Sequence, residues 1–115
     1  PERFAVLTDL AAAIGLLDAA LSARYERAFR PEPLRWEDWA QGQVDKIRRT
    51  LDLFETRSLK GAGEIGIVDI AVGCCLGYLD FRFPEEDWRA TRPKLAAFYA
   101  DLAKRPAWPL TDPAR

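Results

Sequence analysis

The sequence predicts an all-α protein in which four to five helices surround one buried central helix. No alternating strand pattern persists anywhere in the chain. Instead, long segments repeat apolar residues every three or four positions, as the faces of helices do. Residues 65–81 carry apolar side chains on nearly every side, and for a helix this indicates contact with protein all round.

Residues 3–29 form the first predicted helix. Its larger apolar residues follow alternating steps of three and four and predict a buried stripe at Phe4, Leu7, Leu10, Ile14, Leu17 and Leu21. Beside this stripe lies a strip of small residues: Ala11, Ala12, Gly15, Ala19 and Ser22. Small side chains allow another helix, a second domain or a small ligand to come close.

Two prolines, Pro31 and Pro33, interrupt the helical pattern and predict a turn. A second helix follows over residues 36–56. Its predicted buried face consists of Ala40, Val44, Ile47, Leu51 and Phe54. Two long helices joined by a short turn form an antiparallel hairpin.

The central helix has a recognisable start. If Gly66 is its N-cap, the Asp69 carboxylate can accept a hydrogen bond from the Gly66 backbone N–H, while Ile65 and Ile70 form a hydrophobic staple. Because glycine has no side chain, the capping box is only half complete. The segment is short for a membrane span and carries Asp69 and Asp80, which favours a core helix.

The C-terminal third is predicted to contain one more regular helix. Residues 82–89 fit a turn or one short helix. Proline favours the first position of a helix, so the last regular helix begins at Pro93 and ends near Lys104. Its predicted buried face is Leu95, Phe98, Tyr99 and Leu102. The proline-rich tail, residues 107–113, is expected to be an extended segment packed across the bundle.

Composition favours a single helical domain over residues 1–115 and excludes several classes of function. The 115 residues are 49% apolar, which is enough to build one core. The net charge is −1 and no basic stripe is present, which argues against nucleic acid as a partner. Histidine is absent, so a His-containing catalytic triad and a His-based metal site are both excluded.

The two cysteines, Cys74 and Cys75, are adjacent in the central helix, where neighbouring side chains do not face each other. We interpret both as small buried apolar residues, with a redox or metal role as the alternative. The lack of a paired cysteine framework fits a reducing, cytoplasmic location. The glycines at 61 and 63 are too irregular for a phosphate-binding motif.

Several motifs together resemble one family. The central helix begins with Ile65-Gly66-Ile67-Val68-Asp69-Ile70, where an apolar residue, the cap, two residues, Asp and an apolar residue follow one another. Further motifs are Gly15-Leu16-Leu17-Asp18-Ala19, Arg24-Tyr25-Glu26, Arg30-Pro31, Lys46-Ile47-Arg48-Arg49-Thr50-Leu51-Asp52, Gly77-Tyr78-Leu79-Asp80-Phe81-Arg82, Asp87-Trp88-Arg89, Arg92-Pro93-Lys94-Leu95 and Arg105-Pro106. This pattern resembles the C-terminal helical domain of cytosolic glutathione transferases, especially bacterial ones. The main departure is Gly66, where the family commonly has Ser or Thr.

The resemblance implies that this chain is the C-terminal half of a two-domain glutathione transferase. The N-terminal thioredoxin-like domain of that family binds glutathione, a co-substrate and not a covalently bound cofactor, and carries the residue that activates its thiol. No catalytic residue is therefore expected in this chain. The helical half supplies much of the pocket for a hydrophobic electrophile, and the residues expected to contact it are Ala11, Gly15, Asp18, Ser22 and Trp108. The resemblance also implies a homodimer. The composition and charge pattern described above predict a cytoplasmic protein with no metal, nucleic acid or membrane as a partner.

Two alternatives remain at this point. The same helical domain also serves as a protein-interaction module without catalysis, in which case the chain would bind partners only. A helical bundle of unrelated function is the other possibility. A thioredoxin-like pattern in the sequence upstream of Pro1 would favour the transferase.

Overall fold

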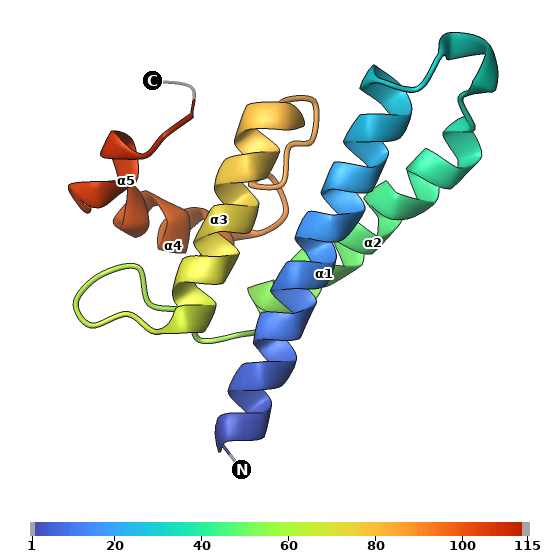
Figure 1. The fold of residues 1–115 in the computed structure, drawn as a ribbon. Coiled ribbons are helices and arrows are strands. Elements are labelled where there is room, and N and C mark those ends of the chain that lie inside the picture. The colour runs from blue at the N-terminus through green and yellow to red at the C-terminus, as the bar shows by residue number, and fades with distance from the viewer. Residues whose placement is uncertain (1, 114–115) are drawn as a thin grey trace.

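The structure is a computed structural model that describes residues 2–113. All of its regular elements in that range are helices: α1 (Glu2–Ala28), the 3₁₀ helix η1 (Glu32–Leu34), α2 (Glu37–Glu55), α3 (Ile67–Arg82), α4 (Pro93–Ala103) and α5 (Ala107–Leu110). Figure 1 shows α1 and α2 as a long hairpin beside α3, with α4 and α5 on the far side of α3. The predicted all-α class is confirmed.

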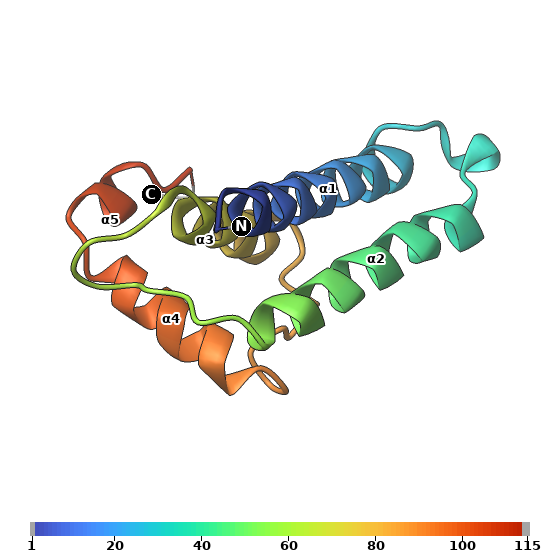
Figure 2. The same cartoon turned by 90° about the horizontal axis from the view of Figure 1, so that it is seen from below.

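The helices form two layers. Seen from below, α1, α3 and α5 lie along one side and α2 and α4 along the other (Figure 2). The molecule is flat, with principal extents of 49 × 36 × 23 Å. We call the side formed by α1, α3 and α5 the front face.

Helix α2 packs as its sequence predicts. Its five expected core residues, Ala40, Val44, Ile47, Leu51 and Phe54, are all buried. Its charged residues lie elsewhere on the helix, and Arg48, for example, pairs with Glu86 at 2.6 Å. The contrast between an apolar and a charged face therefore identifies the inner face of α2 correctly.

Helix α1 packs differently from the prediction. Four members of the expected buried stripe, Phe4, Leu7, Ile14 and Leu21, are exposed, with Phe4 71% exposed. The side chains that α1 buries are instead Ala13, Leu16, Ala19, Ala20 and Ala23. Small side chains let the helix axes come close, and α1 packs through this alanine-rich inner face against α2 and α3.

By length and composition, α1 is also apolar enough to cross a membrane. Its inner face, however, is covered by α2 and α3, and its outer side carries the exposed Asp18. We therefore treat α1 as a helix with two apolar faces, one of which packs in this core.

Helix α3 is central, but it is not covered on every side as its composition suggested. Val72, Cys75, Leu76 and Leu79 are fully buried. Ile67 is 58% exposed and Ile70 is 44% exposed. One side of α3 therefore exposes apolar residues, and this explains why the sequence pattern shows no polar side.

The start of α3 is held by one carboxylate. The Gly66 N–H donates to Asp69 Oδ2 at 2.8 Å, and the Lys60 N–H donates to Asp69 Oδ1 at 3.0 Å. Ile65 is half-buried against the core, whereas Ile70 is exposed. Asp69 thus ties the glycine-rich loop before α3 to the first turn of the helix.

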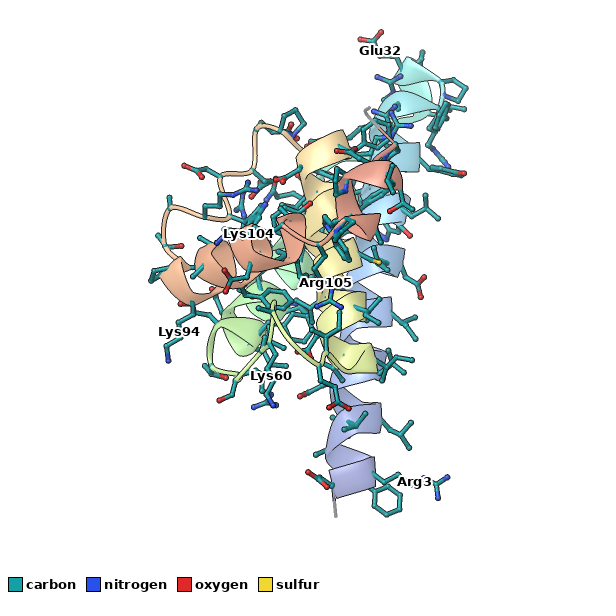
Figure 3. All side chains as sticks on the ribbon, turned by 90° about the vertical axis from the view of Figure 1, so that its left-hand side faces the viewer. Arg3, Glu32, Lys60, Lys94, Lys104 and Arg105 are labelled. Carbon is teal, nitrogen blue, oxygen red and sulfur yellow. The ribbon has the colours of Figure 1, made fainter. Side chains whose placement is uncertain are left out.

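The same loop is also tied to the C-terminal part of the chain. Arg105, at the junction of α4 and α5, donates from Nη1 to the Gly63 carbonyl at 2.9 Å (Figure 3). Gly63 is the only described residue of the chain with a positive φ, +72°, which L side chains rarely adopt. Gly61 lies against the α4 backbone so closely that a Cβ would meet the Phe98 carbonyl oxygen.

Helix α4 begins at Pro93 as predicted, and it is capped by a side chain from α2. The Glu55 carboxylate accepts hydrogen bonds from the N–H groups of Lys94 at 2.9 Å and Leu95 at 2.8 Å. Negative charge is favourable at a helix N-terminus, so this contact fixes the second layer. Of the predicted buried face, Leu95, Phe98 and Leu102 are buried, and Tyr99 is half-buried.

The tail is not extended, contrary to the prediction. It forms the short helix α5, closed by hydrogen bonds from the Thr111 N–H to the carbonyls of Ala107 and Trp108. The Trp108 ring packs on α3 at Gly73, where a Cβ would lie 2.6 Å from Cη2 of the ring. Gly73 is therefore needed for this close approach.

Candidate functional site

Four of the predicted contact residues lie on one side of α1. Ala11, Gly15 and Asp18 are exposed, and Ser22 is half-buried. Their spacing puts them along the outer side of the helix. A Cβ at Gly15 would meet nothing within 4 Å, so this part of α1 is open in the structure. Trp108 is not among them, because it lies on α5.

Ser22 borders a groove of about 490 Å³ between the C-terminal half of α1 and the start of α2. We call it the hairpin groove, and its lining residues are Leu21, Ser22, Tyr25, Glu26, Phe29, Arg30 and Trp39. The Tyr25 and Phe29 rings pack edge to face with their centroids 5.2 Å apart. One wall is therefore aromatic, as is common in pockets for small apolar ligands.

The turn that closes the hairpin holds the groove in shape. Arg27 of α1 forms an ion pair with Glu37 at the start of α2. The Arg30 Nε donates to the Leu34 carbonyl at 2.8 Å, and the Arg35 Nε donates to the Arg30 carbonyl at 2.7 Å. These contacts hold the end of α1 and the start of α2 together, and Trp39 borders the groove from α2.

Trp108 lines a second, separate pocket of about 360 Å³ between α3, α4 and α5. We call it the tail pocket, and its lining residues are Gly73, Cys74, Gly77, Tyr78, Asp80, Phe81, Tyr99, Trp108, Thr111, Asp112 and Pro113. The Tyr99 ring stands edge to face to both Trp88 and Trp108, at centroid distances of 5.8 and 6.2 Å. Trp108 therefore both covers the core and borders a pocket.

An ion pair fixes one end of the tail pocket. Arg89 binds Asp80 through two N–H groups, at 2.7 and 2.8 Å, and the Trp88 indole N–H donates to the same carboxylate at 2.9 Å. The Arg89 guanidinium also lies 4.1 Å from the Trp88 ring centroid. Its hydrogen bond to Asp80 raises the pKa of Arg89, despite partial burial. The carboxylate is thus fully engaged and holds the loop before α4.

The cysteines differ, although the sequence suggested that both are buried. Cys75 is fully buried and its thiol donates to the Ala13 carbonyl at 3.3 Å, but Cys74 is exposed at the mouth of the tail pocket. Burial raises the pKa of both thiols, that of Cys75 to about 12 with a smaller contribution from Cys74. Neither is a thiolate at neutral pH, so neither is an activated nucleophile.

The site therefore offers two pockets with apolar walls and no activated nucleophile among its cysteines. Within residues 2–113, no three His, Cys, Asp or Glu side chains gather in a way that could hold a metal ion. Sequence reasoning missed Tyr25 and Phe29 in the hairpin groove and Tyr78 and Tyr99 in the tail pocket. The paired aromatics at Tyr25 and Phe29, one turn apart beside a proline turn, were a signal for the groove.

Comparison with known proteins gives one consistent result. Residues 37–101 match the family described as "Glutathione S-transferase, C-terminal domain". The Escherichia coli K12 protein called "Uncharacterized GST-like protein YibF" is 33% identical over 108 residues, which cover 91% of this chain and 53% of that protein.

Solved structures agree with this match. A glutathione transferase family member from Pseudomonas fluorescens Pf-5, with bound S-(propanoic acid)-glutathione, is 44% identical and superposes with a TM-score of 0.89, covering 96% of this chain and 57% of that one. A glutathione S-transferase from Methylobacillus flagellatus KT with bound glutathione is 35% identical, with a TM-score of 0.85 and coverages of 96% and 56%. The chain thus spans little more than half the length of these relatives.

Proposed function

Since this chain belongs to the glutathione S-transferase family, as its C-terminal helical domain, we propose that it forms the hydrophobic-substrate side of a two-domain glutathione transferase. The complete protein conjugates glutathione to a hydrophobic electrophile, or carries out a related glutathione-dependent reaction. The chain's length relative to its relatives supports this reading, because about half of each relative lies outside the match.

The observation that carries the proposal is the uncovered apolar surface of the front face. Phe4 and Ile14 on α1 are 71% and 52% exposed, and Ile67 on α3 is 58% exposed. On α1, the exposed residues Phe4, Leu7, Ile14 and Leu21 share one side of the helix. Exposed apolar residues grouped in this way mark an interaction site. Its occupant in our proposal is a thioredoxin-like domain of the same protein, which binds glutathione and activates its thiol.

The hairpin groove is the proposed location of the hydrophobic substrate. It opens beside the outer side of α1, where Asp18 and Ser22 lie, and its walls are mainly apolar and aromatic. Such walls favour a hydrophobic electrophile, while the few polar groups set its orientation. Ala11 and Gly15, further along the same side, border the surface at which glutathione would meet the electrophile.

The reaction requires a thiolate at neutral pH beside an apolar pocket. The raised pKa of Cys74 and Cys75 makes both poor candidates for activating or replacing the glutathione thiol. We therefore assign thiol activation to the other domain and substrate binding to this one. A cytoplasmic homodimer, assembled through α1 and α2, is part of the same proposal.

The test is carried out on the full-length protein. We expect it to be retained on immobilised glutathione and to conjugate 1-chloro-2,4-dinitrobenzene, whereas the helical chain alone does neither. Failure of the full-length protein in both assays would contradict the proposal.

A protein-interaction module without catalysis is the second candidate, and the same exposed front face favours it. The sequence upstream of Pro1 separates the two. A thioredoxin-like pattern with a cis-proline followed by Glu-Ser or a similar pair supports the transferase, and its absence supports the interaction module.

A further inference from the structure

The tail pocket contains hydrogen-bond donors that no other group of the described chain uses. Within residues 2–113, the hydroxyls of Tyr78 and Tyr99 and the indole N–H of Trp108 have no hydrogen-bond partner. In the same range, Glu26 Oε2 on α1 is the one buried side-chain oxygen or nitrogen without a partner. The three donors of the tail pocket are therefore accessible to solvent.

The Tyr99 hydroxyl has a fixed position in the wall of this pocket. Its ring stands edge to face to both Trp88 and Trp108. Its oxygen lies close to Gly77 of α3, which also lines the pocket, and a Cβ at Gly77 would be 3.2 Å from that oxygen. The two rings thus hold Tyr99 in place, and the absence of a side chain at Gly77 lets the hydroxyl approach α3.

The other polar side chains that line the pocket are already engaged. Asp80 accepts two hydrogen bonds from Arg89, at 2.7 and 2.8 Å. The Thr111 hydroxyl donates to a backbone carbonyl at 2.9 Å, and Asp112 also has a partner. Because the unused groups can donate, a ligand that suits the pocket has to bring a hydrogen-bond acceptor.

The size, walls and charges of the pocket favour a neutral aromatic ligand. Its volume of about 360 Å³ lies within the usual range of small-molecule sites, roughly 300–1,000 Å³. Aromatic rings line it, among them those of Phe81 and Trp108. The carboxylates of Asp80 and Asp112 also line it and disfavour an anion. An ammonium group is not suited either, because it offers donors only.

We infer that the tail pocket is a second binding site, for neutral aromatic molecules that carry an acceptor such as a ketone oxygen, and that the Tyr99 hydroxyl donates to this acceptor. The pocket shares no lining residue with the hairpin groove. Binding there requires neither glutathione nor catalysis, so the inference goes beyond the proposed function and does not rest on it. Aryl ketones, aryl esters and quinones have the required chemistry.

The test uses two ligands of nearly the same shape, 2-acetylnaphthalene and 2-isopropenylnaphthalene, of which only the ketone carries an acceptor oxygen. Binding to the 115-residue chain is followed at Cys74, which is exposed and lines the pocket. A bound ligand should slow the alkylation of Cys74 by iodoacetamide, and mass spectrometry at increasing ligand concentration then gives the affinity. The fully buried Cys75 should stay unmodified.

Tyr99→Phe removes the hydroxyl and keeps the ring. Loss of one hydrogen bond should weaken the binding of 2-acetylnaphthalene roughly 3- to 10-fold and leave that of 2-isopropenylnaphthalene within about twofold. Tyr25→Phe removes a hydroxyl in the hairpin groove instead, and as the matched control it should change neither affinity. Gly77→Ala adds a methyl group that crowds the Tyr99 hydroxyl, so it should also weaken the ketone and serves if Tyr99→Phe fails to fold.

Several outcomes would overturn the inference. One is that neither ligand protects Cys74, and another is that Tyr99→Phe leaves the affinity for the ketone unchanged or weakens both ligands equally. A loss of ketone affinity in Tyr25→Phe would place the ligand in the hairpin groove. Full-length protein that conjugates an aromatic halide but shows no protection of Cys74 would leave the proposed function intact and contradict only this inference.

Discussion

Helices α1 and α2 are partners in one hairpin, yet they present different surfaces to solvent. Helix α2 buries large side chains, such as Ile47 and Phe54, and turns charged residues outward. Helix α1 buries mainly alanines and turns large apolar residues, such as Phe4 and Ile14, outward. The outer side of α2 is mainly charged, which suits contact with water, whereas the outer side of α1 exposes large apolar residues.

The difference shows that a large apolar residue on α1 need not be buried within this chain. Exposed large apolar residues on α1 mark a candidate interaction surface, whereas its small residues mark the surface that packs most closely within this chain. An apolar stripe on both sides of a helix therefore indicates two partners. For α1, one is the α2–α3 core, and the other is the domain that we propose to cover the front face.

The largest effect is expected from the inner face of α2. Phe54→Ala removes a fully buried ring and should lower the free energy of unfolding by about 3–5 kcal/mol. The adjacent Leu53→Ala, at a position 37% exposed, is the control and should cost much less. Urea denaturation of both variants measures the difference, and equal midpoints would show that the inner face of α2 is wrongly assigned.

The inner face of α1 should be sensitive to the opposite change, in which a larger side chain is placed in a closely packed contact. Ala20 is fully buried where α1 packs closely, so Ala20→Leu should cost about 1–3 kcal/mol of stability. Ala11→Leu, on the exposed side of the same helix, should be close to neutral in the same denaturation experiment. If Ala20→Leu were tolerated as well as Ala11→Leu, the buried alanines of α1 would not be required for close packing.

These helices also show which parts of the fold were predictable. The inner faces of α2 and α4 followed from sequence because charged residues mark their opposite sides. On α1 both sides are apolar, so the pattern of large residues pointed to Phe4 and Ile14 when the core contact is made by Ala13 and Ala20. The tail was missed because α5 has only 4 residues, too few for any periodicity.

The candidate site was predictable only in part, for a related reason. Spacing on one helix could group Gly15, Asp18 and Ser22, because positions along α1 are fixed by its geometry. It could not add Trp39, whose place beside Ser22 depends on how the hairpin turn sets α2 against α1. It also could not separate Trp108 from the α1 residues, since that depends on the path of the chain around α3.

Glycines on the outer sides of the two helices allow the same comparison with a smaller expected effect on stability. A Cβ at Gly15 of α1 or at Gly42 of α2 would meet nothing within 4 Å. Glycine costs a helix about 0.5–1 kcal/mol relative to alanine, so Gly15→Ala and Gly42→Ala should each stabilise this chain by about that amount. In the full-length protein, Gly42→Ala should keep its benefit. Gly15→Ala should lose it there if a second domain packs closely on α1, and an equal gain at both positions would argue against such contact.

The smallest effect on stability should come from the residue that is most informative about the front face. Ile14 is 52% exposed and lies outside the core, so Ile14→Ser should change the free energy of unfolding of this chain by no more than about 0.5 kcal/mol. The same change interrupts the apolar surface, and it should therefore reduce self-association of the isolated chain. Sedimentation velocity over a range of protein concentrations measures this. Thr50→Ser, on α2, is the control variant and should leave both the stability and the self-association unchanged.

In the full-length protein, Ile14→Ser should lower the free energy of unfolding by much more than in the isolated chain, because there the side chain would be buried between domains. A cost that stayed the same in both proteins would mean that α1 carries its outer apolar residues for some surface other than a domain interface.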